Sequence, residues 1–208
     1  MTTFYLVRHG KTTFNKVGRL QGGVKDSPLL PESIENAKKT GCYLGGVDFD
    51  AAFSSPQKRA FETGENIIAQ FDTPLELQKV DALREFDFGD WDGDLAADHI
   101  DDPRWQAFLN DPQNFDGSSF NAESYYDLVD RVEKTLKDIA TKYPDANILL
   151  TAHALVITFA VKHLLGKELN EIREEGLVAN TSVTVLELEP DLNGEATLKR
   201  WNDTTHLV

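Results

Sequence analysis

Short apolar runs and longer amphipathic repeats alternate along this chain. Runs rich in β-branched and aromatic residues predict strands, because such side chains fit a pleated, half-buried surface. The predicted strands occupy residues 4–7, 51–54, 75–80, 148–151, 181–188 and 196–201. The last two are expected to form a hairpin through Pro190 and Asn193-Gly194, since these residue types favour tight turns.

Helical periodicity marks segments between the strands. Apolar residues recur at three- and four-residue steps over 121–143, which predicts a long amphipathic helix. Residues 32–44 and the nearly all-apolar segment 154–165 predict two more helices. Another helix is expected after Ser55 and Pro56, with the serine as N-cap and the proline in the first helical position. This alternation is typical of an α/β fold, a three-layer α/β/α sandwich with a mostly parallel central sheet.

One segment interrupts the alternation. Residues 95–117 combine a short helix around Trp105 and Phe108 with turns rich in Asp, Pro and Asn, and we interpret them as a surface insertion. Its aromatic residues Trp105 and Phe108 are expected to serve lid or core packing. No repeat or Pro/Gly/Ser-rich linker divides the chain. Residues 1–208 are therefore expected to form one domain, with a lid insertion at about 92–122.

Composition narrows the classes of function. Acidic residues outnumber basic residues by 35 to 21, which gives a formal charge of -14. This balance argues against nucleic-acid binding, which normally needs a basic face, and against docking on an anionic membrane. A single cysteine, Cys42, cannot form an intrachain disulfide, and the N-terminus lacks the apolar run of a signal peptide. We expect a soluble, cytoplasmic protein whose oligomeric state stays open, a homodimer being one option.

Ionisable residues follow four of the predicted strands. Arg8 and His9 come after the first strand, Arg59 lies shortly after the second, Glu85 follows the third, and His153 follows the fourth. The carboxyl ends of parallel strands meet at one edge of a sheet, and open α/β sheets bind ligands there. The sequence therefore predicts a cationic site with two histidines and a carboxyl group at this edge.

These residue types suit phosphoryl transfer. Arginine holds a phosphate through paired hydrogen bonds and stays charged. A neutral imidazole is a competent nucleophile at phosphorus, and a second imidazole can donate to the phosphate oxygens. A carboxyl group beside a dianion has a raised pKa, so Glu85 is suited to protonate a leaving oxygen and later to activate water. Nothing in this set requires a metal ion or a cofactor.

Other candidate sites have simpler explanations. A single histidine or arginine at a strand end is more often solvated or ion-paired than functional. His153 and His163 are too far apart for the i, i+4 spacing of a helical metal site. The acidic run 87–94 lacks the spacing and the closing glutamate of an EF-hand loop. There is no G-x-S-x-G, P-loop or G-x-G-x-x-G motif, so the usual signatures of rival enzyme classes are absent.

Ordered motifs run along almost the whole chain. They are Arg8-His9-Gly10 with Asn15, Gln21-Gly22, Asp26-Ser27-Pro28-Leu29, Ser54-Ser55-Pro56 with Arg59-Ala60 and Thr63, Leu83-Arg84-Glu85-Phe86, Gly89-Asp90-Trp91-Asp92-Gly93, Glu123-Ser124, His153, Asn180, Asn202-Asp203 and His206-Leu207. The Arg-His-Gly triplet alone is a weak signal, whereas the full ordered set is specific. With this set the chain resembles the histidine phosphatase superfamily, in its phosphoglycerate mutase-like branch.

The resemblance implies a covalent phosphohistidine mechanism. His9 would be the nucleophile, and Glu85 would protonate the leaving group and then act as the base for water. Arg8, Arg59 and His153 would complete the catalytic set. The implied phosphate-binding residues are Arg8, Asn15, Gln21, Gly22, Arg59, His153 and Ala154. The family pattern involves no metal and no cofactor, and it places substrate choice in the insertion at 92–122.

The chain departs from the family pattern at three positions. Lys11 stands where glutamate is common, and Ala122 and Ala154 stand where glycine is usual. None of these changes removes a reacting group. We therefore expect an active enzyme. Its expected partner is a small phosphorylated metabolite.

Three functions are compatible with these motifs. The first is an acid-type phosphatase that hydrolyses small phosphomonoester metabolites. The alternative is a cofactor-dependent phosphoglycerate mutase, although the Asn-Glu-Arg-His run of true mutases is absent after Glu85. A non-catalytic phospho-ligand-binding module is a further alternative, but such a module would not need a nucleophile at His9. The sequence leaves the identity of the phosphate ester open.

Overall fold

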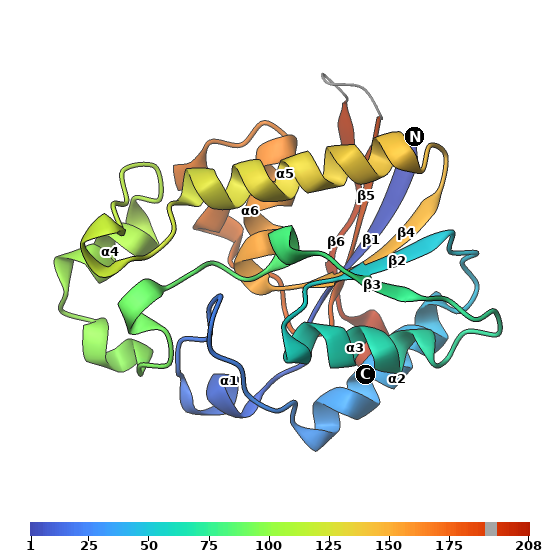
Figure 1. Ribbon diagram of the computed structural model, residues 1–208, viewed down its shortest axis with the longest axis horizontal. Coiled ribbons are helices and arrows are strands. Elements are labelled where there is room, and N and C mark those ends of the chain that lie inside the picture. The colour runs from blue at the N-terminus through green and yellow to red at the C-terminus, as the bar shows by residue number, and fades with distance from the viewer. Residues whose placement is uncertain (190–194) are drawn as a thin grey trace.

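The strands of the computed structural model, which describes residues 1–189 and 195–208, lie in one mixed sheet (Figure 1). The described strands are β1 (Thr2–Arg8), β2 (Ala51–Ser54), β3 (Leu77–Lys79), β4 (Asn147–Ala152), β5 (Val183–Leu188) and β6 (Ala196–Asp203). Their order across the sheet is β3-β2-β4-β1-β5-β6. From β3 to β1 neighbouring strands are parallel, and β5 and β6 add antiparallel pairs at one edge. The mostly parallel sheet predicted from the sequence is confirmed.

Helices cover both faces of this sheet. The described α-helices are α1 (Thr13–Val17), α2 (Pro31–Leu44), α3 (Lys58–Ile68), α4 (Pro103–Asn110), α5 (Tyr125–Lys142) and α6 (Ala154–Leu164). In β1, Phe4 and Leu6 belong to a hydrophobic cluster with α5 and α6, whereas Val7 belongs to a second cluster with α2 and α3. Alternate residues of the strand thus point to opposite layers, as the pleat requires. The predicted three-layer α/β/α arrangement is confirmed (Figure 1).

Two predicted helix starts are wrong. Helix α3 begins at Lys58 rather than after Ser55, because the Ser55 hydroxyl accepts the N–H of Gln57 in a turn before the helix (3.3 Å). Helix α5 begins at Tyr125 rather than near 121, because Asn121 has a left-handed backbone with φ of 61°. The predicted hairpin turn at Pro190 and Asn193-Gly194 lies outside the described residues.

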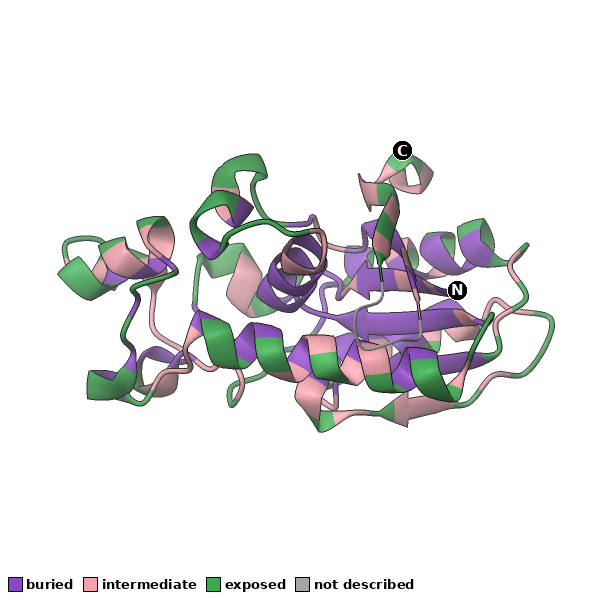
Figure 2. Cartoon of the chain, turned by 90° about the horizontal axis from the view of Figure 1, so that it is seen from above, coloured by how far each residue is buried: buried purple, intermediate pink, exposed green. Residues whose placement is uncertain are grey.

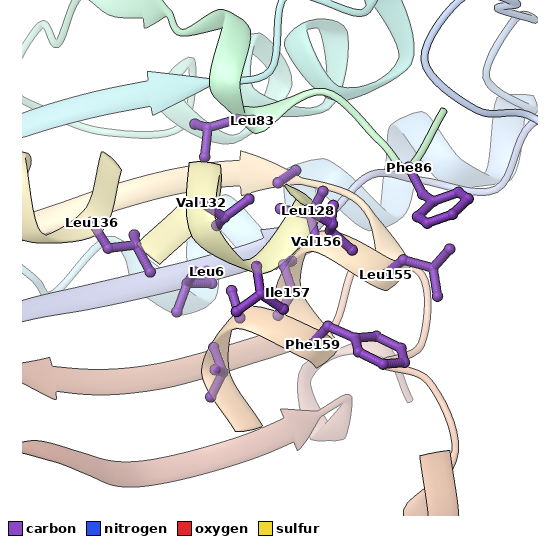
Figure 3. Packing of buried hydrophobic residues seen from close by; sticks show 14 of the residues in the cluster. Leu6, Leu83, Phe86, Leu128, Val132, Leu136, Leu155, Val156, Ile157 and Phe159 are labelled. Carbon is purple, nitrogen blue, oxygen red and sulfur yellow. The ribbon is translucent and has the colours of Figure 1, made fainter. Parts of the chain in front are cut away.

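Helix α6 runs through the interior of the molecule. Its residues 154–162 are all buried, as its apolar sequence predicts, whereas α5 alternates buried and exposed positions (Figure 2). Leu128 and Val132 of α5 and Val156 and Phe159 of α6 are members of the main hydrophobic cluster (Figure 3). In the described part of the chain neither α6 nor another helix is long and apolar enough to cross a membrane.

The insertion contributes to the main hydrophobic cluster. Its aromatic side chains Trp105, Phe108 and Phe115 are buried there together with Phe86 and Tyr125. The ring of Phe108 lies 5.4 Å, centroid to centroid, from each of the rings of Phe86 and Tyr125. The insertion therefore reaches into the core instead of lying only on the surface, because apolar rings of this size gain stability by burial. For Trp105 and Phe108, the expected packing role is confirmed as core packing.

Replacing Phe108 with alanine should lower the free energy of unfolding by about 3–5 kcal/mol, because it leaves a cavity among buried rings. Ile100→Ala is the matched control in the same insertion, since Ile100 is 59% exposed, and its effect should stay within about 0.5 kcal/mol. Urea unfolding measures both variants. Equal effects of the two substitutions would show that the insertion is not part of the cooperative core.

Candidate active site

Two histidines leave the sheet side by side. The parallel register pairs Arg8 of β1 with Ala152 of β4, so the next residues, His9 and His153, emerge from neighbouring strand ends. Their ring centroids lie 5.1 Å apart, and both side chains are buried. The predicted meeting of these residues at the carboxyl edge of the sheet is thus seen in the structure.

The ring of His9 is held in one orientation and one tautomer. Its Nδ1 lies 2.7 Å from the carbonyl oxygen of Gly10, and because a carbonyl only accepts, Nδ1 must donate. Burial, followed by the charges of Arg59 and Arg8, lowers the pKa of His9 well below its usual value. The ring is therefore neutral near neutral pH, and its Nε2 carries a lone pair.

His153 is held by the strand on its other side. Its Nε2 lies 2.8 Å from the hydroxyl oxygen of Ser55, which follows β2. Burial and the charge of Arg59 lower the pKa of His153 well below its usual value. Its Nδ1 is buried and has no hydrogen-bond partner among the described residues. A neutral His153 with its proton on Nδ1 therefore offers an uncommitted donor.

Two arginines accompany the histidines, Arg59 buried and Arg8 half-buried. The Arg8 Nη1 donates to the carbonyl of Val178 (2.7 Å), and burial lowers the Arg8 pKa to about 10, which leaves it charged at neutral pH. Arg59 is 1% exposed, and its Nη1 donates to Oδ1 of Asp26 (3.2 Å). Within the described residues the Nε of each arginine is buried without a partner. Buried guanidinium donors without a partner are suited to an anionic ligand.

A loop wraps around the Arg59 guanidinium. Its Nη2 donates to the carbonyls of Gln21 and Gly22, each at 3.1 Å, and its Nη1 donates to that of Lys25 (3.1 Å). A Cβ at Gly22 would lie 2.5 Å from the carbonyl oxygen of Phe86, so only glycine fits this close approach. The loop and the cation therefore fix each other.

Glu85 lies at the N-terminus of α6. Its Oε1 accepts the N–H of Phe86 (3.0 Å), and its carboxyl oxygens lie 3.4 Å from the N–H groups of Leu155 and Val156. Burial nevertheless raises the pKa of Glu85 above its usual value, and this effect outweighs the opposing hydrogen bonds and the arginine charges. The carboxyl group is therefore more readily protonated than an exposed glutamate.

A cleft of about 540 Å³ opens beside Glu85. Its lining includes Gly23, Val24, Arg84 and Asp87 in addition to Glu85 itself. Glu85 therefore lines this cleft and lies close enough to Arg59 and Arg8 for their charges to act on its pKa. Among the described residues, His, Cys, Asp and Glu side chains do not gather in groups of three or more that could hold a metal ion.

The remaining sequence-predicted residues have mixed positions. The Asn15 side chain accepts the N–H of Thr12 (3.1 Å), which caps the short helix α1. The Gln21 side chain donates to Asp26 (3.1 Å), so it orients the partner of Arg59. Ala154 is the first residue of α6, directly after His153. Gly22 lies at the site, and the direct phosphate contacts of Asn15, Gln21 and Ala154 stay predictions.

Two residues that organise the site were not identified from the sequence. Gln57 links the loop to the acid, because its Nε2 donates to the carbonyl of Gly22 (2.6 Å) and its Oε1 accepts the N–H of Glu85 (2.8 Å). Asp92 accepts the N–H groups of Gly22, Val24 and Lys25 (2.7, 2.9 and 2.7 Å). In the sequence Asp92 belongs to the Gly89–Gly93 motif and to an acidic run but is given no role of its own, and Gln57 carries no distinguishing signal.

Comparisons with known proteins identify the family of the chain. A model of the histidine phosphatase superfamily (branch 1) matches residues 4–204. The chain is 31% identical over 164 residues to an adenosylcobalamin/alpha-ribazole phosphatase of Escherichia coli, covering 78% of each chain. It is 27% identical over 212 residues to phosphoserine phosphatase 1 of Hydrogenobacter thermophilus, covering 100% of this chain and 95% of the relative.

A solved structure shows the same architecture over the full length. The protein YhfR of Bacillus stearothermophilus superimposes with a TM-score of 0.91 at 25% identity, covering 100% of both chains. The phosphoglycerate mutase-like fold expected from the sequence is thus confirmed. Since the family model also spans nearly the whole chain, the chain belongs to the histidine phosphatase superfamily (branch 1).

Proposed function

We propose that the chain is a metal-independent, acid-type phosphatase that hydrolyses small phosphomonoester metabolites through a phosphohistidine at His9. The observation that carries this proposal is a neutral His9 ring, with Nε2 as its lone-pair atom, buried beside His153 and two arginines. Membership of the family and its named phosphatases, which act on phosphoserine and alpha-ribazole esters, support a phosphatase.

In the first step the phosphate group binds between Arg8, Arg59 and His153. The arginines balance its charge, which is the part that a metal ion plays in other phosphatases. The Ser55 hydroxyl donates to Nε2 of His153, so Nδ1 of this ring donates to a phosphate oxygen. Nε2 of His9 attacks phosphorus, the bond to the ester oxygen breaks, and Glu85 gives its proton to the departing alcohol.

In the second step water attacks the phosphohistidine. The Glu85 carboxylate takes a proton from the water as the new P–O bond forms, and the P–N bond to His9 breaks. Inorganic phosphate leaves, His9 regains its lone pair, and Glu85 is protonated again. The net reaction consumes one ester and one water and produces one alcohol and one phosphate.

The charges at the cleft favour hydrolysis over phosphoglycerate mutase activity. A mutase must hold a second acidic group of its bisphosphate intermediate. In the cleft Arg84 pairs with Asp81 (3.2 Å), Arg131 pairs with Glu123 (2.5 Å), and Asp87 adds a further carboxylate. Such a surface disfavours a second phosphate or carboxylate. The mutase stays the alternative, and a non-catalytic binding module is the further one.

The same proposal covers the part of the chain that selects the substrate, the class of partner and the place of action. The insertion at 92–122 shapes the choice of ester, and the partner is a small metabolite rather than a nucleic acid or a membrane. The place of action is the cytoplasm, and a homodimer stays an option.

His9→Ala should lower phosphate release from small phosphomonoesters by on the order of 10⁴-fold or more, because it removes the nucleophile of the proposed mechanism. The assay contains a metal chelator and covers a panel of esters, with 3-phosphoglycerate isomerisation measured in parallel. His163→Ala is the matched control, since His163 pairs with Glu133 outside the site. Turnover that survives in His9→Ala would contradict the mechanism, and bisphosphate-primed isomerisation would favour the mutase.

The pH profile of kcat/KM should be bell-shaped for an alkyl phosphate. On the acid side activity falls only when the pH drops through the His9 pKa, which lies well below 6.5. On the alkaline side activity falls as Glu85 loses its proton, at a pKa raised above 4.5.

Glu85→Gln tests whether the alkaline fall in kcat/KM belongs to Glu85. The amide does not titrate, so the alkaline fall should disappear while kcat/KM drops by about 10²- to 10⁴-fold. An alkaline fall that persists in this variant would assign the acid role to another group.

A further inference from the structure

The segment that carries Glu85 has no regular secondary structure. Residues 84–88 follow a 3₁₀ turn at Asp81–Leu83 and belong to no helix or strand. The backbone N–H of Glu85 is held by Gln57 (2.8 Å). The position of a proton donor matters at the scale of about 1 Å in a reacting complex. Other contacts must therefore fix the rest of this segment.

Arg131 of α5 supplies such contacts. Its Nη1 donates to the carbonyls of Ala82 (2.6 Å) and Arg84 (2.8 Å), and its Nη2 lies 3.4 Å from the carbonyl oxygen of Glu85. One planar guanidinium thus binds three backbone carbonyls, two from residues that precede Glu85 and one from Glu85 itself. The fixed fork of donors makes arginine suited to this task, and lysine cannot reproduce it.

Glu123 completes the arrangement on the other side of the acid. Its carboxylate accepts two hydrogen bonds from Arg131, from Nε (2.5 Å) and from Nη2 (2.9 Å). Its Oε2 also accepts the N–H of Asp87 (3.2 Å), and its own N–H donates to the Asp87 carbonyl (2.9 Å). The side chains of Arg131 and Glu123 are 24% and 14% exposed, so the pair is better shielded than an ordinary surface ion pair.

We propose that Arg131 and Glu123 are positioning residues that hold the Glu85 carboxyl at the leaving oxygen of the substrate. This inference rests on the proposed function, because it concerns the proton donor of that reaction. Neither residue reacts. Together they bind the backbone on both sides of Glu85 and tie it to the long helix α5, which packs against the core.

The proposal predicts a dependence on the leaving group. An alkoxide is a strong base and needs the Glu85 proton as it departs, whereas p-nitrophenolate is a weak base and departs without it. The parameter kcat/KM reports the steps up to loss of the leaving group and is independent of phosphohistidine hydrolysis. A displaced proton donor should therefore lower kcat/KM for an alkyl phosphate far more than for p-nitrophenyl phosphate.

Arg131→Lys and Glu123→Gln test this in the full chain, with glycerol 2-phosphate and p-nitrophenyl phosphate as substrates. We expect kcat/KM to fall by about 10- to 100-fold for the alkyl ester and by less than about threefold for the aryl ester. Lys134→Met is the control, since Lys134 is an exposed cation on the same helix, and it should change neither value. Melting temperatures identify a variant that fails to fold, and Glu123→Gln keeps the size of the native side chain.

Glu85→Gln measured alongside separates two kinds of failure. Suppose that Glu85→Gln lowers kcat/KM selectively for the alkyl ester, but Arg131→Lys and Glu123→Gln lower kcat/KM equally for both substrates or for neither. In that case the positioning role is wrong and the proposed function stands. If Glu85→Gln itself shows no selectivity, Glu85 is not the proton donor, and the positioning role fails together with that part of the proposed function.

Discussion

The site depends on keeping the buried cation of Arg59 hydrogen-bonded. Removing a guanidinium from water costs several kcal/mol unless its donors are satisfied. Here Asp26 and the carbonyls of Gln21, Gly22 and Lys25 accept hydrogen bonds from its two Nη groups, so residues 21–26 must curve around the cation. Two residues before the arginine, Gln57 links that loop to Glu85. The positions of the loop 21–26, of the start of α3 and of Glu85 are therefore all linked to the Arg59 cation.

The sheet and the loops position their residues by different means. His9 and His153 are fixed by backbone register, since each comes directly after a strand whose partners are set over its full length. Glu85 follows no strand directly, so its position depends on side chains that bind its backbone. We therefore expect the histidine pair to tolerate changes outside the sheet better than the acid, whose position depends on residues that take no part in the reaction.

Periodicity and strand ends are the features that make this fold and site predictable from the sequence. The strands, the layers and the grouping of Arg8, His9, Arg59, Glu85 and His153 are encoded in patterns that extend over several residues. Side-chain hydrogen bonds leave no such pattern, so the role of Gln57 was missed. The same reason explains the wrong start of α3, because the Ser55 hydroxyl is engaged in a turn and near His153 rather than at a helix cap. For Trp105 and Phe108 the sequence left lid packing and core packing open, because the partners of these residues lie far away in the sequence.

Burial shifts the pKa values of the nucleophile and of the acid in opposite directions, and this arrangement prepares the proposed reaction. Burial and the arginine charges lower the pKa of His9, which keeps the nucleophile unprotonated, while burial raises the pKa of Glu85, which favours the protonated acid. The arginine charges oppose the second effect, because cations favour a carboxylate. A bound phosphate dianion would balance these cations and so raise the pKa of Glu85 further. Substrate binding would therefore complete the protonation that departure of the alcohol requires, and loss of the product would reverse it.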